Sequence, residues 1–154
     1  MFWLNGVGFA SLFPRYPELK SALGLGELGW GLVVGLGPLG GLIAGLFTAR
    51  LIRRFTSAKV NLFTALLGLA MLSVYGNATH WTVFALGILL MAGLDAISDI
   101  SMNAHGLRVQ KLYGRSILNG LHGWWSVGAV SGGLLGALAA QARIPIWLQC
   151  LLAF

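Results

Sequence analysis

The sequence predicts an all-α fold, a polytopic bundle of transmembrane helices. Hydrophobic residues make up 57% of the 154 residues and charged residues only 9%, against about 25% charged residues in ordinary globular domains. So few charges cannot cover a water-exposed surface. Several apolar runs also approach the about 20 residues that a helix needs to cross a bilayer. We therefore expect a lipid-embedded protein and exclude disordered, collagen-like and disulfide-rich classes.

Six helical segments are expected in order along the chain, and the first and last are incomplete. Residues 1–13 do not begin with the basic residues typical of a signal peptide, and several spans follow them. We therefore interpret them as the end of a helix and not as a signal peptide. Residues 28–48 are rich in glycine, and residues 81–107 are long enough to tilt or protrude. The expected segments are 1–13 (partial), 28–48, 60–76, 81–107, 117–140 and 144–154 (partial). The chain 1–154 thus resembles a fragment cut at both ends.

The positive charges predict how the helices are oriented. The segments after residues 28–48 and after residues 81–107 hold seven of the ten basic residues, which are Arg50, Arg53, Arg54, Lys59, Arg108, Lys111 and Arg115. Lys and Arg in short loops favour the cytoplasmic side, so the first helix is expected to run outward. A net charge of +6 can indicate nucleic-acid binding. Here its distribution follows the apolar segments, and we expect no nucleic-acid partner.

Glycines recur at intervals of four in two segments. Residues 28–48 contain Gly37, Gly41 and Gly45, and residues 117–140 contain a second stripe, which consists of Gly128, Gly132 and Gly136. Such stripes let helix backbones approach closely. Each stripe falls in the second helix of a three-helix group, which is also the pattern of the inverted repeats of some transporters.

Two acidic residues stand inside an apolar segment. Asp95 and Asp99 are four residues apart within residues 81–107, so they share one helix face. A charged carboxylate near the bilayer centre is costly and often belongs to a proton relay. We therefore predict a proton-coupling role for both residues. A buried structural hydrogen bond is the alternative.

Polar and aromatic residues in neighbouring segments predict a site for a small polar ligand such as a sugar. Tryptophan rings stack on such ligands, and amides and hydroxyls bind them by hydrogen bonds. Packing is the alternative for the tryptophans, and a structural hydrogen bond is the alternative for the histidine. The candidate substrate-binding residues are Asn5, Asn103, Asn119, His122, Trp124 and Trp125.

Other chemistries lack a pattern in the sequence. No group of Cys, His and acidic residues has the spacing of a zinc site. The glycines lie in apolar helices and not in a phosphate-binding loop. No Ser-His-Asp arrangement is evident either. We expect no metal, no cofactor and no enzymatic activity.

Two stretches resemble the N-terminal half of a major facilitator superfamily transporter. Residues 49–59, Ala-Arg-Leu-Ile-Arg-Arg-Phe-Thr-Ser-Ala-Lys, resemble that superfamily's loop pattern G-x-L-a-D-R-x-G-R-R. Arg50, Arg53, Arg54 and Lys59 are the basic residues of this loop motif. Arg53 stands where the pattern has an acid, and Thr56 stands where it has a glycine.

The second stretch is more specific. Residues 99–103, Asp-Ile-Ser-Met-Asn, and residues 118–128, Leu-Asn-Gly-Leu-His-Gly-Trp-Trp-Ser-Val-Gly, are similar to the fourth and fifth helices of the fucose-permease-like branch. By this resemblance Asp99 has the role of the proton-coupling and substrate-binding acid, and Asn103 that of the asparagine four positions later. Asp95 has no counterpart there, so its predicted role depends on its place in the membrane.

The resemblance implies a secondary active transporter of a bacterial inner membrane. We expect about five helices and the start of a sixth of a multi-pass protein. A C-terminal helical half outside this chain would complete it. The expected activity is symport, the proton-coupled uptake of a small polar solute such as a sugar by alternating access. An efflux antiporter, a non-transporting membrane module and an inactive truncated fragment remain as alternatives.

Overall fold

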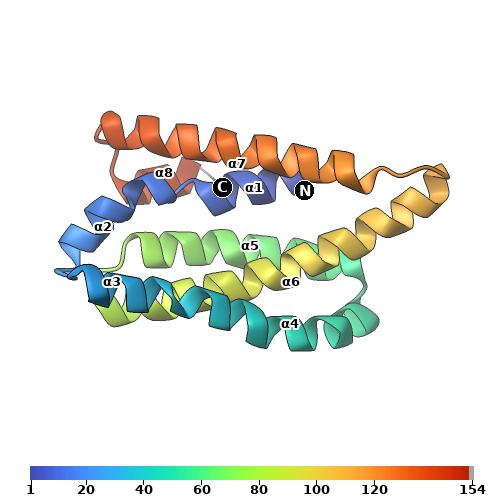
Figure 1. Ribbon diagram of the computed structural model, residues 1–154, viewed down its shortest axis with the longest axis horizontal. Coiled ribbons are helices and arrows are strands. Elements are labelled where there is room, and N and C mark those ends of the chain that lie inside the picture. The colour runs from blue at the N-terminus through green and yellow to red at the C-terminus, as the bar shows by residue number, and fades with distance from the viewer. Residues whose placement is uncertain (153–154) are drawn as a thin grey trace.

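The structure is a computed structural model that describes residues 1–152, and these residues form helices and no strand (Figure 1). The all-α prediction is confirmed. The helices are α1 (Phe2–Ala10), η1, a short 3-10 helix (Phe13–Arg15), α2 (Tyr16–Ala22), α3 (Glu27–Val34), α4 (Leu36–Phe55), α5 (Ser57–Gly76), α6 (Trp81–Tyr113), α7 (Leu118–Gln141) and α8 (Ile146–Leu152).

Within the described residues, four helical stretches are long and apolar enough to cross a membrane. They are Glu27–Phe55, in which α3 and α4 follow each other with only Gly35 between them, Ser57–Gly76, Trp81–Tyr113 and Leu118–Gln141. They correspond to the four complete spans expected from the sequence. The multi-pass architecture therefore follows from length and apolar composition.

Two helices continue beyond the apolar spans predicted from the sequence. Helix α4 continues to Phe55 and α5 begins at Ser57. The basic residues expected in a loop therefore lie on helix ends, and Thr56 alone separates the two helices. Helix α6 continues to Tyr113, so Arg108 and Lys111 are also helical. Hydropathy indicates where a helix leaves the lipid, but the backbone stays helical until a residue stops it. For α6 this residue is Gly114, with φ 66° in the left-handed region.

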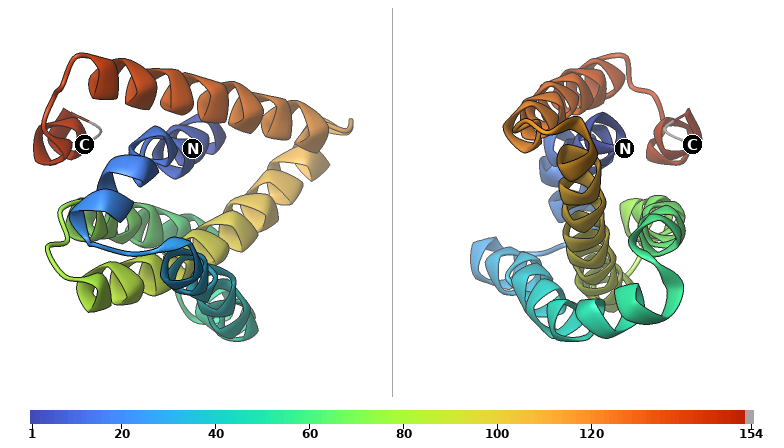
Figure 2. Two further views of the ribbon diagram at one scale, coloured as in Figure 1. Left: turned by 60° about the vertical axis from the view of Figure 1, so that its left-hand side comes forward. Right: turned by 90° about the vertical axis from the view of Figure 1, so that its right-hand side faces the viewer.

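The helices pack in two groups. Helix α6 lies along α4 and α5, and α1 lies along α7, whereas few contacts join the α1/α7 pair to the α4/α5/α6 group. Figures 1 and 2 show α1 beside α7 on one side of the bundle and α3 to α6 on the other. The α4–α5 junction and the end of α6 lie at the same end of the molecule in Figure 1. This arrangement puts the basic residues of both predicted cytoplasmic segments on one side.

The α1/α7 pair depends on glycine. A methyl group on Gly128, Gly132 or Gly136 of α7 would lie 2.1–2.3 Å from a backbone oxygen of Trp3, Val7 or Ser11. A methyl group on Gly6 of α1 would in turn lie 2.2 Å from the backbone oxygen of Trp125. No side chain fits in these spaces. The glycine stripe predicted in residues 117–140 is therefore a helix-packing surface.

The other predicted stripe is not the tight contact of its helix. A methyl group on Gly37, Gly41 or Gly45 would find its nearest neighbours 3.7–3.8 Å away, an ordinary contact distance. The close approach is at Gly40, where a methyl group would lie 2.0 Å from the backbone oxygen of Leu89 on α6. The spacing predicted a glycine face on α4. Helix α6 crosses α4 most closely at Gly40, which lies next to that face.

We expect Gly132→Ala to lower the free energy of unfolding in detergent by about 1–3 kcal/mol, because the added methyl group overpacks the α1/α7 contact. Gly133→Ala is the matched control, since a methyl group there meets nothing within 4 Å. The measurement is thermal or denaturant unfolding followed by circular dichroism. Equal stability of the two variants would contradict this packing.

Candidate functional site

One predicted acid on α6 is joined to two other helices by a chain of hydrogen bonds. Asn5 of α1 donates its Nδ2–H to Oδ1 of Asp95 at 2.8 Å. Trp125 of α7 donates its indole Nε1–H to Oδ1 of Asn5 at 2.7 Å. All three residues are partly buried. The structure thus brings together three predicted site residues from segments that are far apart in the sequence.

The second acid has a local partner. Asn103 donates its Nδ2–H to Oδ2 of Asp99 at 3.1 Å, one turn along α6. The carbonyl oxygen of the Asn103 side chain is buried and has no partner among the described residues. Asp99 and Asn103 are therefore adjacent on one face of α6. No described residue forms an ion pair with either acid, because both ion pairs lie elsewhere.

Asp95 lines a cavity of about 250 Å³ between α1, α5 and α6. Asn5, Asn61, Thr64 and Ser98 supply its other polar side chains. Asn61 is only 4% exposed and donates its Nδ2–H to both the backbone oxygen and Oγ of Ser98 at 3.0 Å. Sequence reasoning missed this pair. An asparagine inside the apolar segment 60–76 was the available signal.

A second cavity, of about 410 Å³, lies closer to the basic end of the bundle and shares Asn61 and Met102 with the first. His105, Gly106 and Trp124 also line it. Of the predicted substrate-binding residues, Trp124 lines this cavity and Asn5 lines the smaller one.

The structure separates the remaining candidates. His122 and Asn119 are exposed on α7 and line neither cavity. The His122 ring meets the edge of the Phe2 ring at a centroid distance of 5.3 Å. Trp125 is turned toward Asn5, whereas its neighbour Trp124 is 61% exposed. The basic residues of the loop motif, Arg50, Arg53, Arg54 and Lys59, are all exposed.

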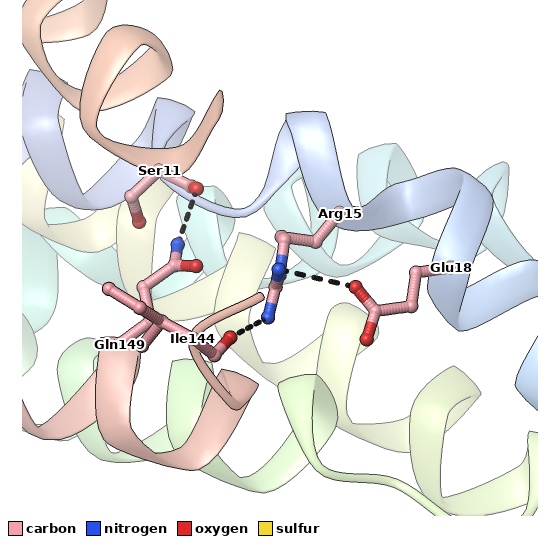
Figure 3. A network of polar contacts seen from close by, with 5 residues as sticks. All are labelled: Ser11, Arg15, Glu18, Ile144 and Gln149. Carbon is pink, nitrogen blue, oxygen red and sulfur yellow. Dashed lines mark hydrogen bonds and ion pairs between the residues drawn. The ribbon is translucent and has the colours of Figure 1, made fainter. Parts of the chain in front are cut away.

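A separate polar network joins the α1 end of the chain to α8 (Figure 3). Arg15 is 2% exposed, donates to the backbone oxygen of Ile144 and lies 3.3 Å from Oε2 of Glu18. Gln149 of α8 donates to the backbone oxygen of Ser11 at 2.8 Å. Arg15 is one of the three basic residues outside the two predicted cytoplasmic segments, so a loop on the opposite side of the membrane is expected for it. The structure instead uses it as a buried link between η1 and the segment that precedes α8.

Among residues 1–152, no group of three or more His, Cys, Asp and Glu side chains is arranged to hold a metal ion. The polar groups around Asp95 are amides, hydroxyls and one carboxylate. These groups can exchange protons with water and bind polar solutes by hydrogen bonds.

Two curated proteins are similar to nearly the whole chain. A protein of Sinorhizobium fredii named as an uncharacterized transporter is 27% identical over 150 residues, which are 97% of this chain and 40% of that protein. A protein of Yersinia pestis named as an uncharacterized MFS-type transporter is 29% identical over 160 residues, or 99% of this chain and 38% of that protein. Both relatives are transporters by name.

The chain spans about two fifths of the length of the curated relatives it matches. No family model and no solved structure matches it.

We expect Arg15→Met to lower the free energy of unfolding by about 1–3 kcal/mol, because it leaves a buried carbonyl group without its donor. Lys20→Met is the control, since Lys20 pairs with the exposed Glu27, and such surface pairs contribute about 0–1 kcal/mol. Unfolding in detergent measures both variants. A larger loss for Lys20→Met would show that the Arg15 network is not a structural link.

Proposed function

We propose that this chain is the N-terminal part of a secondary active transporter of the major facilitator superfamily, in the fucose-permease-like branch. Its activity is the proton-coupled uptake of a small polar solute, such as a sugar, across a bacterial inner membrane. The observation that carries the proposal is the pair of carboxylates, Asp95 and Asp99, one turn apart inside the span Trp81–Tyr113. The transporter names of the two relatives support it, and they also fit a protein that is not an enzyme.

The two carboxylates have the surroundings that a proton-coupling site needs. Each accepts a hydrogen bond from one amide, and neither pairs with a cation among the described residues. An ionised carboxylate inside a membrane span is costly unless water or a counter-charge reaches it. Binding a proton removes that cost. The proton biases the protein toward whichever conformation binds it more tightly, and only to the extent of that difference.

The solute would bind between this chain and the part of the protein that lies beyond it. The relatives are about two and a half times as long as the matched region, which leaves room for a second helical half. We assign solute binding to the six predicted residues. Trp124, His122 and Asn119 are exposed on α7, and Asn103, Trp125 and Asn5 lie beside the two acids.

In the transporter that contains this chain, we expect Asp99→Asn to abolish accumulation of solute driven by a pH gradient. The variant amide cannot bind and release the proton, but it still fits the space, so exchange of solute across the membrane should persist. Uptake into membrane vesicles measures accumulation, and counterflow measures exchange. Glu27→Gln, which changes an exposed acid at the first residue of a span, is the control. Normal gradient-driven accumulation in Asp99→Asn would disprove the assigned role of this acid.

Access of water to the acids separates a transporter from a membrane module that does not transport. We expect cysteines in Asp95→Cys and Asp99→Cys to react with a water-soluble thiol reagent, because a proton-coupling site must reach water. Ile88→Cys, on the same helix but buried, should not react. The native Cys150 is buried, so its background labelling should be low. Protection of both positions under all transport conditions would favour the non-transporting module.

A further inference from the structure

The hydrogen bond from Asn5 to Asp95 links the two helix groups. Among residues 1–152, Asn5 to Asp95 is the only hydrogen bond between two side chains that joins the α1/α7 pair to the α4/α5/α6 group. Contacts of any kind between these groups are few, whereas the helices within each group pack closely against one another. A change in this bond therefore acts where the bundle is least constrained.

The direction of the hydrogen-bond chain is fixed by chemistry. An indole N–H can only donate, so the atom of Asn5 that meets Trp125 must be the carbonyl oxygen Oδ1. The amide nitrogen Nδ2 then has to face Asp95, where it donates to Oδ1 of the carboxylate. Asn5 cannot rotate its amide without leaving the indole N–H unpaired.

We propose that Asn5 is a positioning residue that transmits the protonation state of Asp95 on α6 to Trp125 on α7. This inference rests on the proposed function, because it assigns a consequence to the proton that the transporter would bind. It gives Asn5 and Trp125 a role in coupling that is distinct from contact with the solute.

The physical basis is the charge on Asp95. Hydrogen bonds to an ionised carboxylate are about twice as strong as bonds between neutral groups. A charge at one end of a chain also polarises the next bond, by about 10–30% in condensed-phase estimates. When a hydronium ion transfers one proton to Oδ2 of Asp95, an O–H bond breaks on the hydronium ion, an O–H bond forms on Oδ2, and neutral water remains. The Asn5–Asp95 bond then loses its charge assistance, and the Trp125–Asn5 bond weakens with it.

The cavity beside Asp95 provides a place for the water that supplies this proton. Oδ2 of Asp95 accepts no hydrogen bond from the described residues, whereas Oδ1 is held by Asn5. Asp95 lines the cavity of about 250 Å³, which is large enough for several waters at about 30 Å³ each. The glycine contacts keep α1 on α7, so a weaker Asn5–Asp95 bond weakens the side-chain link between this helix pair and α6.

Other titratable groups near this chain are few. On α6 the neighbour is Asp99, on α5 it is Tyr75, and on α7 it is His122. Helix α1 contains no titratable side chain. The basic side chains of α4 lie in its last two turns, at Arg50, Arg53 and Arg54. A test must therefore separate Asp95 from Asp99, Tyr75 and His122.

The test follows the indole N–H resonance of Trp125 by NMR in nitrogen-15-labelled protein as the pH is changed. Trp125→Phe assigns the resonance and keeps the ring contact with Phe9. We expect this resonance to move with pH and to lose that movement in Asp95→Asn. Asp99→Asn and His122→Gln should keep it. The indole resonance of Trp124, which is not hydrogen-bonded to this chain of residues, should not follow Asp95.

Asn5→Leu, which keeps the volume of the side chain, should uncouple Trp125 from Asp95 even if Asp95 still titrates. If Asn5→Leu does not fold, the pH dependence of the Trp125 resonance in Asp95→Asn is the test of the proposal. A Trp125 resonance that stays fixed wherever the protein is folded, or that still moves in Asp95→Asn, overturns the proposal. Loss of proton-driven uptake in Asp99→Asn tests the proposed function separately, so either idea can fail without the other.

Discussion

Close contact between helix backbones at glycine is the interaction on which the rest of this bundle depends. In lipid there is no hydrophobic force between apolar helices, so van der Waals packing must hold them together. The carbonyl oxygens of Trp3, Val7 and Ser11 lie where side chains on α7 would otherwise stand. This contact fixes the register of α1 on α7. It thereby sets Asn5 beside Trp125, and the polar site follows from the packing.

Each acid inside the spans has a hydrogen-bond partner. Asp95 and Asp99 each have an amide partner, and Asn61 is satisfied by Ser98. The buried Arg15, which directly precedes α2, has the carboxylate of Glu18 and the backbone oxygen of Ile144 as partners. In Figure 1, α2 lies at the opposite end of the molecule from the α4–α5 junction. An unpaired polar group is costly inside a membrane. Two helices that are joined by fewer polar hydrogen bonds therefore need less free energy to separate. The weakest junction is the one that a single proton on Asp95 would affect.

Some of the site could be predicted because its chemistry is local. Asp95 and Asp99 are conspicuous in an apolar segment, and Asp99 to Asn103 is one helical turn, a distance that sequence spacing specifies. The partner of Asp95 could not be predicted in this way. Asn5 is 90 residues away, and only the crossing of α1 with α6 and α7 brings it there. For the same reason Gly40, and not the predicted stripe, makes the tight contact on α4.

The sequence by itself determined the class of the protein, the number of complete spans and the side on which basic residues gather, because these follow from apolar length and charge. It also indicated Thr56 as a departure from a glycine position. The structure shows why this position favours glycine, since Thr56 has φ 71°. Only the tertiary structure decided which glycines make the tight contacts and that Asn5 joins Asp95 to Trp125. Those features depend on contacts between distant helices, and a linear pattern does not encode the angle at which two helices cross.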